Sequence, residues 1–107
     1  MNKIWIYKGR EFPFDVTEEY CYSLVSRGLG ELREELDKME EGAFEGGCCD
    51  KVRAFFDTVF GVGAGKLICG SRRSAEDHIS AYISFISFLC SQVDEFSRLR
   101  VTVEARV

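Results

Sequence analysis

An apolar segment in the C-terminal third, ISAYISFISFLC at residues 79–90, most constrains how this chain folds. Ser74 and Asp77, three residues apart, match a capping box and predict a helix over residues 75–97. Apolar side chains cover most of the circumference of this helix: Ile79, Tyr82, Ile83, Phe85, Ile86, Phe88, Leu89, Val93 and Phe96. Because a helix that is apolar nearly all round is usually buried, we expect it at the centre of the core.

The same segment carries two further signals. A bilayer span takes about 20 apolar residues, so this shorter, serine-interrupted run predicts no membrane-spanning helix and no membrane partner. Its serines fall on one stripe of the helix, at Ser80, Ser84, Ser87 and Ser91. The stripe fits a half-exposed face, which we favour, or a groove in which a second helix approaches closely.

The N-terminal residues predict a β-hairpin. β-branched and aromatic residues at 3–7 and 11–14 flank a turn at 8–10, and Pro13 limits the second strand to an edge. The last residues alternate with period two, which predicts either a third strand or an extended arm over 99–107. The sequence therefore predicts a mainly helical α+β fold with an N-terminal β-hairpin, three main helices and that C-terminal segment, in a single domain over 1–107.

A second helix is predicted over residues 16–41, with Asp15 and Glu18 as its capping box. Gly28 and Gly30 weaken this helix, so we expect a kink or break there. Apolar residues recur along this helix in a narrow heptad-like seam: Val25, Leu29, Leu32, Leu36 and Met39. The seam has two interpretations. It packs thinly on the chain's own core, or it binds a partner, either a second copy in a homo-oligomer or a helical client.

The third helix is predicted over residues 51–60, after a breaker at 45–50 in which Asp50 acts as the N-cap. Gly61 is expected to end it, and one further helical turn is expected at 64–69. The glycines between them suggest a phosphate loop, but a leucine follows Lys66 where the pattern needs Ser or Thr, and a helix precedes them instead of a strand. We therefore expect a helix end and a tight turn, with no nucleotide or other cofactor.

Charge and catalytic groups exclude several function classes. The net charge is −4, and residues 30–45 hold seven acids against two bases, so a nucleic-acid partner is disfavoured. The only histidine, His78, is expected to be exposed at a helix start, and the acids are expected to face water. No arrangement of nucleophile and base is visible, which predicts a protein that is not an enzyme.

The five cysteines predict a reducing compartment. Their number is odd and no secretory signal opens the chain, so we expect unbridged thiols and a cytoplasmic protein. Cys48 and Cys49 are adjacent and lack the ligand spacing of a zinc site, so no metal is expected. Cys21, Cys69 and Cys90 lie beside apolar residues and are expected to act as small hydrophobic side chains.

The stretch FFDTVFGVGAGKLICG at 55–70 resembles a signature of short proteins from the tail region of tailed phages and prophages of Gram-positive bacteria. The matching residues are Phe55, Phe56, Asp57, Phe60, Gly61, Gly63, Lys66, Ile68 and Gly70, with Pro13, Phe14 and Asp15 earlier in the chain. The resemblance implies a tail assembly chaperone that binds a helical tape-measure protein in the host cytoplasm. Two alternatives remain: an inhibitor of a host defence system, and a minor virion or oligomeric adaptor protein.

Overall fold

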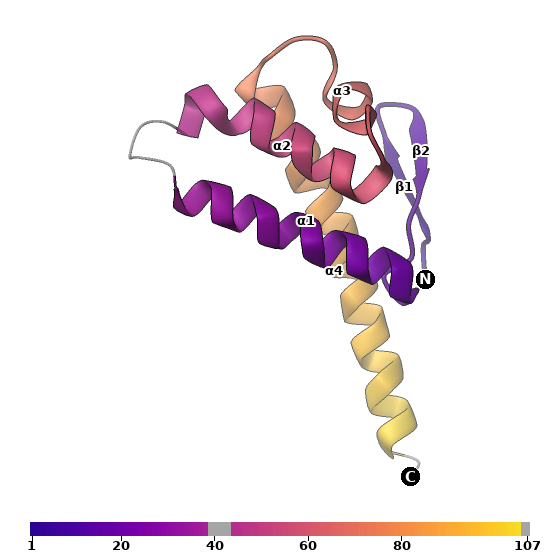
Figure 1. Cartoon of the computed structure of the whole chain (residues 1–107). Helices are drawn as coiled ribbons and strands as arrows, with labels where there is room; N and C mark the ends of the chain where they lie inside the picture. The colour runs from indigo at the N-terminus through magenta and orange to yellow at the C-terminus, as the bar shows by residue number, and fades with distance from the viewer. Residues whose placement is uncertain (39–43, 106–107) are drawn as a thin grey trace.

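A computed structural model describes residues 1–38 and 44–105 of the chain (Figure 1). The elements run in the order β1 (Ile4–Tyr7), β2 (Arg10–Pro13), α1 (Glu19–Asp37), α2 (Phe44–Phe60), α3 (Ala64–Cys69) and α4 (Ala75–Ala105). The two strands form an antiparallel hairpin, and the remainder is mostly helical. The predicted α+β, mainly helical fold is confirmed, although several boundaries differ from those expected.

The hairpin closes through a two-residue turn. Tyr7 pairs with Arg10, while Lys8 and Gly9 between them have φ of 50° and 78°. Positive φ at both central positions is the type I′ geometry, whose twist matches that of the strands. Successive side chains point to opposite faces, so Trp5 and Phe12 are buried on the body while their neighbours face outward.

Helix α1 begins at Glu19, three residues later than predicted, because Asp15 stabilises a turn instead of capping the helix. Its carboxylate accepts hydrogen bonds from the Thr17 backbone N–H at 2.9 Å and the Thr17 hydroxyl at 2.6 Å. Glu18 takes the N-cap position without a side-chain capping bond. The capping-box prediction is therefore wrong at this helix.

Helix α1 continues through both of its glycines, so the predicted break is also wrong. Gly28 faces α2, where a Cβ would lie 3.1 Å from the Phe55 ring. The missing side chain lets the two helices approach closely, and this packing offsets the poor helix propensity of glycine. The predicted end of the helix, at residue 41, lies outside the described residues.

Helix α2 begins at Phe44, not at residue 51, so the breaker at 45–50 is a wrong prediction. Cys48 and Cys49 are buried within it, and burial of this face outweighs the local preference of the glycines. Asp50 lies inside the helix, where it accepts a hydrogen bond from Arg73 at 2.5 Å instead of capping the N-terminus.

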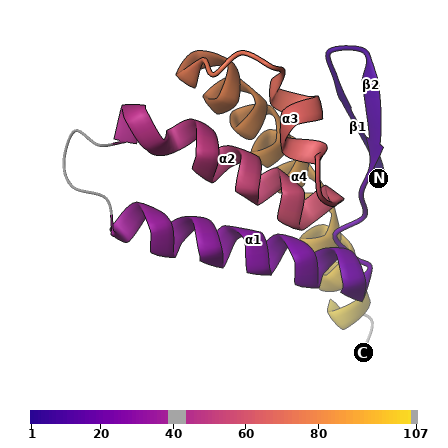
Figure 2. The same ribbon diagram turned by 45° about the horizontal axis from the view of Figure 1, so that its top comes forward.

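Aromatic side chains from the hairpin, α2 and α4 form the centre of the core. The Trp5 ring lies 5.7 Å from that of Phe56 and 5.2 Å from that of Phe85, measured between centroids. Its indole N–H donates to the Ser84 hydroxyl at 3.1 Å, which satisfies the buried polar atom. Figure 2 shows α4 passing behind α1 and α2 while the hairpin stands at one end of the layer.

Helix α4 runs to Ala105, well past the predicted end at residue 97. The prediction of a strand or extended arm over 99–107 is wrong through residue 105; the last two residues lie outside the described part. No glycine or proline follows Gly70, and two ion pairs four residues apart, Asp94–Arg98 and Arg100–Glu104, support the final turns. The C-terminal part of α4 therefore projects as a helix beyond the body (Figure 1).

Candidate interaction surface

The glycine-rich stretch between α2 and α3 is a helix end followed by a tight turn, as predicted. Gly61 and Gly63 have φ of 106° and 94°, a region that side-chain-bearing residues rarely adopt. The Asp57 carboxylate accepts a hydrogen bond from the Gly65 backbone N–H at 2.7 Å. A carboxylate of the protein thus occupies the start of α3 where a phosphate would need to bind.

Gly65 and Arg53 explain the close packing of α3 on α2. A Cβ on Gly65 would lie 2.4 Å from the Arg53 carbonyl oxygen, so only glycine fits without a shift. The Arg53 guanidinium reaches past this contact and donates from Nη2 to the Gly70 carbonyl at 2.9 Å. The glycines of the motif therefore serve close approach and turn geometry.

His78 is fully buried, and the prediction of an exposed histidine is wrong. Arg53 Nε donates to His78 Nε2 at 2.8 Å, and His78 Nδ1 lies 2.6 Å from the Ser74 carbonyl oxygen. Because Arg53 can only donate and the carbonyl can only accept, the ring is the neutral form with its proton on Nδ1. Both ring nitrogens are engaged, so His78 joins α2 to the start of α4 and is not available as a base.

Among the described residues, no three metal-binding side chains cluster, and no helix is long and apolar enough to cross a membrane. Cys69 is buried, and burial raises the pKa of its thiol to about 11. Cys21 is half-buried, whereas Cys90 is exposed, contrary to the expectation of a packed hydrophobic side chain.

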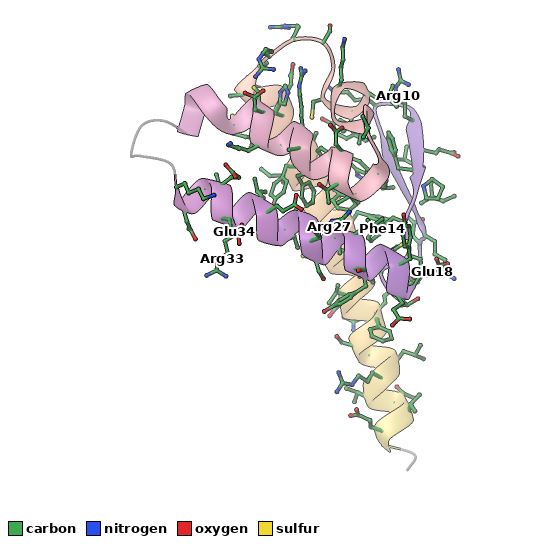
Figure 3. The ribbon with its side chains drawn as sticks, in the orientation of Figure 1. Arg10, Phe14, Glu18, Arg27, Arg33 and Glu34 are labelled. Atoms are coloured by element: carbon green, nitrogen blue, oxygen red, sulfur yellow. The ribbon has the colours of Figure 1, made fainter. Side chains whose placement is uncertain are left out.

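The predicted seam on α1 mostly faces the chain's own core. Val25 and Leu32 are buried against α2, Leu29 is partly buried, and Leu36 lines a small apolar cavity of about 120 Å³ between α1, α2 and α4. Met39 lies outside the described residues. Of the two predicted arrangements, packing on the core is the one observed at Val25 and Leu32. The opposite side of α1 is charged, and Figure 3 shows Arg33 pointing away from the body.

Sequence reasoning missed an exposed apolar surface on α4. The side of α4 that faces the core carries Phe85, Leu89 and Gln92, all buried, with spacings of four and three. The same helical face continues past the body as Phe96, Leu99 and Val103, which are 44%, 62% and 57% exposed. We call these three residues the projecting stripe. The continued spacing signals it, but the assumed helix end at residue 97 concealed it.

A groove lies where the projecting stripe leaves the body. It has a volume of about 450 Å³ and is lined by Met1, Lys3, Thr17, Glu95, Phe96 and Leu99. The terminal ammonium of Met1 lies 3.5 Å from the Glu95 carboxylate and fixes the N-terminus against α4. The lining of the groove thus combines three apolar side chains with three polar or charged ones.

A family model matches residues 8–104, described as Family of unknown function (DUF6673). The chain belongs to this family. No curated protein and no solved structure matched it. The DUF6673 match includes the whole projecting stripe as well as the glycine-rich motif, so α4 lies within the family's matched range up to residue 104.

Gln92 is a second feature of this DUF6673 chain that sequence reasoning missed. It is buried and anchors the N-terminal segment to α4: its Oε1 accepts from the Val16 N–H at 3.0 Å, and its Nε2 donates to the Asn2 and Phe14 carbonyls, both at 2.7 Å. A polar residue in the middle of a core-facing stripe is the signal that could have found it.

Proposed function

We propose that this protein is a non-catalytic protein-binding module that holds an α-helical partner along the projecting stripe and the adjoining groove. The observation that carries the proposal is the continuity of the core face of α4, which stays apolar after the body ends, with its side chains about half exposed. Exposing three large apolar side chains on one face costs solubility unless a partner covers them.

A helical partner fits this surface best. Phe96, Leu99 and Val103 recur with spacings of three and four, which is the pattern with which one helix packs along another. The groove continues the same surface onto the N-terminal segment. The flanking charges are of both signs, with Glu95 and Arg100 on either side, and such charges are suited to setting the register of a bound helix.

The resemblance at residues 55–70 supports a biological setting for this activity. We propose a tail assembly chaperone that holds helical segments of a phage tape-measure protein in the bacterial cytoplasm until assembly. Tape-measure proteins are long and helical, so they present repeated apolar faces that need cover before assembly. A chaperone of this kind needs an accessible apolar surface and no catalytic group, and the projecting stripe meets the first requirement.

Co-expression with the tape-measure protein encoded in the same phage or prophage tests the proposal. The double variant Leu99→Glu with Val103→Lys should lose co-purification of that protein, because a few apolar anchors dominate such interfaces. Both side chains are more than half exposed, so folding should be unchanged.

Val101→Glu is the matched control for this experiment. Val101 is 64% exposed but lies on the far side of α4, since two residues turn a helix by about 200°. The control should retain the tape-measure protein. Equal retention by the control and the double variant would overturn the proposal.

A further inference from the structure

Positive charge collects at one end of the molecule, where the hairpin turn lies beside α3 and the loop that leads into α4 (Figure 1). The net charge of the chain is −4, and many lysines and arginines in the described part form ion pairs with carboxylates. Within that part, Arg33 and Arg53 form no such pair, and neither do four bases at this end: Lys8, Arg10, Lys66 and Arg72. The bases without a carboxylate partner are therefore concentrated around the hairpin turn and α3.

A groove lies between β2 and α3 at this end. It consists of two adjoining cavities, of about 410 Å³ and 660 Å³, whose linings share Gly63 and Leu67. We call it the cationic groove, and it has two halves. The charged half is lined by Arg10, Lys66 and Ser71, and the apolar half is lined by Pro13, Val62 and Leu67, together with Phe12 and Phe60 from the core. Figure 3 shows the Arg10 side chain at the turn end of the hairpin, beside α3.

Among the described residues, no acidic side chain lines the cationic groove. Glu11 follows Arg10 in β2, but adjacent side chains of a strand point to opposite faces. The Asp57 carboxylate already accepts a hydrogen bond from the backbone at the start of α3. Burial raises the pKa of the Cys69 thiol, and the nearby charge of Lys8 opposes that rise, so Lys8 adds positive charge beside α3. The groove therefore offers positive charge that the chain itself does not neutralise.

The apolar half of the cationic groove is accessible as well. Val62 is fully exposed, and Leu67 is 47% exposed. Lys66 and Leu67 are neighbours on α3, so positive charge and apolar surface lie next to each other. A small inorganic anion would contact the charged half alone and would leave these apolar side chains in water. A ligand that covers both halves carries a negative group beside an apolar group.

We propose that the cationic groove binds a segment of another protein in which carboxylates alternate with apolar side chains. The carboxylates lie against the charged half, and the apolar side chains lie against the apolar half. Charge complementarity supports this occupant, because the groove supplies bases that have no carboxylate partner within the described part of the chain. Complementary charge across an interface steers a partner towards its site and fixes its register.

Nucleic acid fits the cationic groove less well. Single strands bind by stacking their bases on aromatic side chains. The rings at this groove belong to the core instead: Phe12 is buried, Phe60 is partly buried, and their centroids lie 5.4 Å apart. The net charge of −4 also repels a long polyanion. A short acidic protein segment carries few charges and needs no stacking surface, so it suits the groove better.

The cationic groove and the projecting stripe are separate surfaces. The groove lies beside the hairpin turn, whereas the stripe lies on the C-terminal part of α4, at the other end of the molecule (Figure 1). Both surfaces can therefore be occupied at the same time. The acidic partner does not depend on the helical client that we propose above, and a chain that binds both would link them.

Fluorescence anisotropy with a labelled dodecapeptide of alternating glutamate and leucine tests the proposal. The wild type should bind the peptide saturably at low salt, and the affinity should fall as salt screens the charges. Lys66→Glu should weaken binding at least about tenfold, because it places a like charge against the carboxylates. Arg33→Glu is the matched control, since it makes the same charge change at an exposed base that points away from the body (Figure 3), and it should bind like the wild type. No saturable binding, or equal weakening by both variants, would refute the proposal.

Two further measurements identify the class of ligand. Leu67→Gln should weaken binding of the peptide about fivefold, because a few apolar anchors dominate such contacts, while Leu99→Gln in the projecting stripe should leave it unchanged. A dodecapeptide of alternating glutamate and serine should bind more weakly than the leucine peptide, and so should a single-stranded DNA of twelve nucleotides. Equal binding of the two peptides would show that charge alone is recognised. Tighter binding of the DNA, lost in Lys66→Glu, would show a nucleic-acid site. Either result would overturn the proposed acidic and apolar segment.

Discussion

Replacing each of three glycines by alanine gives a direct test of the packing between the helices. Gly65, Gly28 and Gly30 all lie in helices, but their surroundings differ. A Cβ at Gly65 would lie 2.4 Å from the Arg53 carbonyl oxygen and 2.7 Å from the Arg53 Cα. At Gly28 the nearest atom is in the Phe55 ring, 3.1 Å away, and at Gly30 nothing lies within 4 Å.

The expected changes in the free energy of unfolding follow from two opposing effects. Alanine in place of a helical glycine gains about 1 kcal/mol from helix propensity. Overpacking costs about 1–3 kcal/mol and more where the neighbour cannot move, and the Arg53 backbone is fixed in the middle of α2. Gly65→Ala should therefore lose about 2 kcal/mol or more. Gly30→Ala should gain about 1 kcal/mol, and Gly28→Ala should fall between them because an aromatic ring can tilt.

Urea unfolding followed by far-UV circular dichroism measures all three variants. Equal slopes with denaturant would confirm that the midpoint reports stability alone. Gly30→Ala controls for the propensity effect, since it makes the same chemical change in open space. Ordinary surface substitutions change the free energy of unfolding by no more than about 0.5 kcal/mol. If the change for Gly65→Ala is that small, the close contact between α3 and α2 is wrong.

Three further predictions concern buried polar groups and thiols. Gln92→Met should cost about 3 kcal/mol in urea unfolding, because it leaves a buried backbone N–H and two carbonyls unpaired; a loss below about 1 kcal/mol would contradict that role. The Thr17 hydroxyl, which donates to the Asp15 carboxylate, holds the pKa of that group below its usual value against the opposing effect of burial. The Asp15 contribution to stability is thus complete above its unfolded pKa of about 3.9 and is lost as pH falls through the lower folded value, so Asp15→Asn should flatten the acid limb of the stability curve. Ellman's reagent should modify the exposed Cys90 quickly and the buried Cys69 slowly, because burial raises the pKa of the Cys69 thiol to about 11. Mass spectrometry after timed reaction measures the two rates, and equal rates would contradict this prediction.

Local sequence patterns predicted elements well where the local signal and the packing agree. The hairpin, the end of α2 at Gly61 and the capping of α4 by Ser74 all have strong local signals. Ser74 Oγ accepts from the Asp77 N–H at 3.3 Å, as the capping box predicts. The glycines inside α1 and α2 have poor helix propensity, so the sequence wrongly predicted breaks at these positions. Both segments are helical in the structure, and at Gly28 the close approach of a residue distant in sequence, Phe55, favours the helix.

The partners of the buried polar residues could not be predicted from local patterns, because they are distant in sequence. The position of His78 near the start of a helix predicts an exposed side chain. In the structure the side chain is buried, and Arg53 from α2 lies beside it and donates a hydrogen bond to it. Gln92 contacts segments more than seventy residues away. Such contacts follow from the tertiary arrangement, and a single sequence does not reveal that arrangement.

The residues of the glycine-rich motif, on which the proposed phage setting rests, mainly build the fold. Phe55, Phe56 and Ile68 are buried, Asp57 binds the start of α3, and the glycines hold positive φ, while the side chain of Lys66 is exposed. A motif of this kind fixes how α2, α3 and α4 pack, and chains that share it should share the direction in which α4 leaves the body. We therefore expect the motif to position the projecting stripe and to take no part itself in the binding of the helical partner that we propose. Variants of the motif should lose the helical partner only when they unfold the protein, whereas variants of the stripe should lose it in a folded protein.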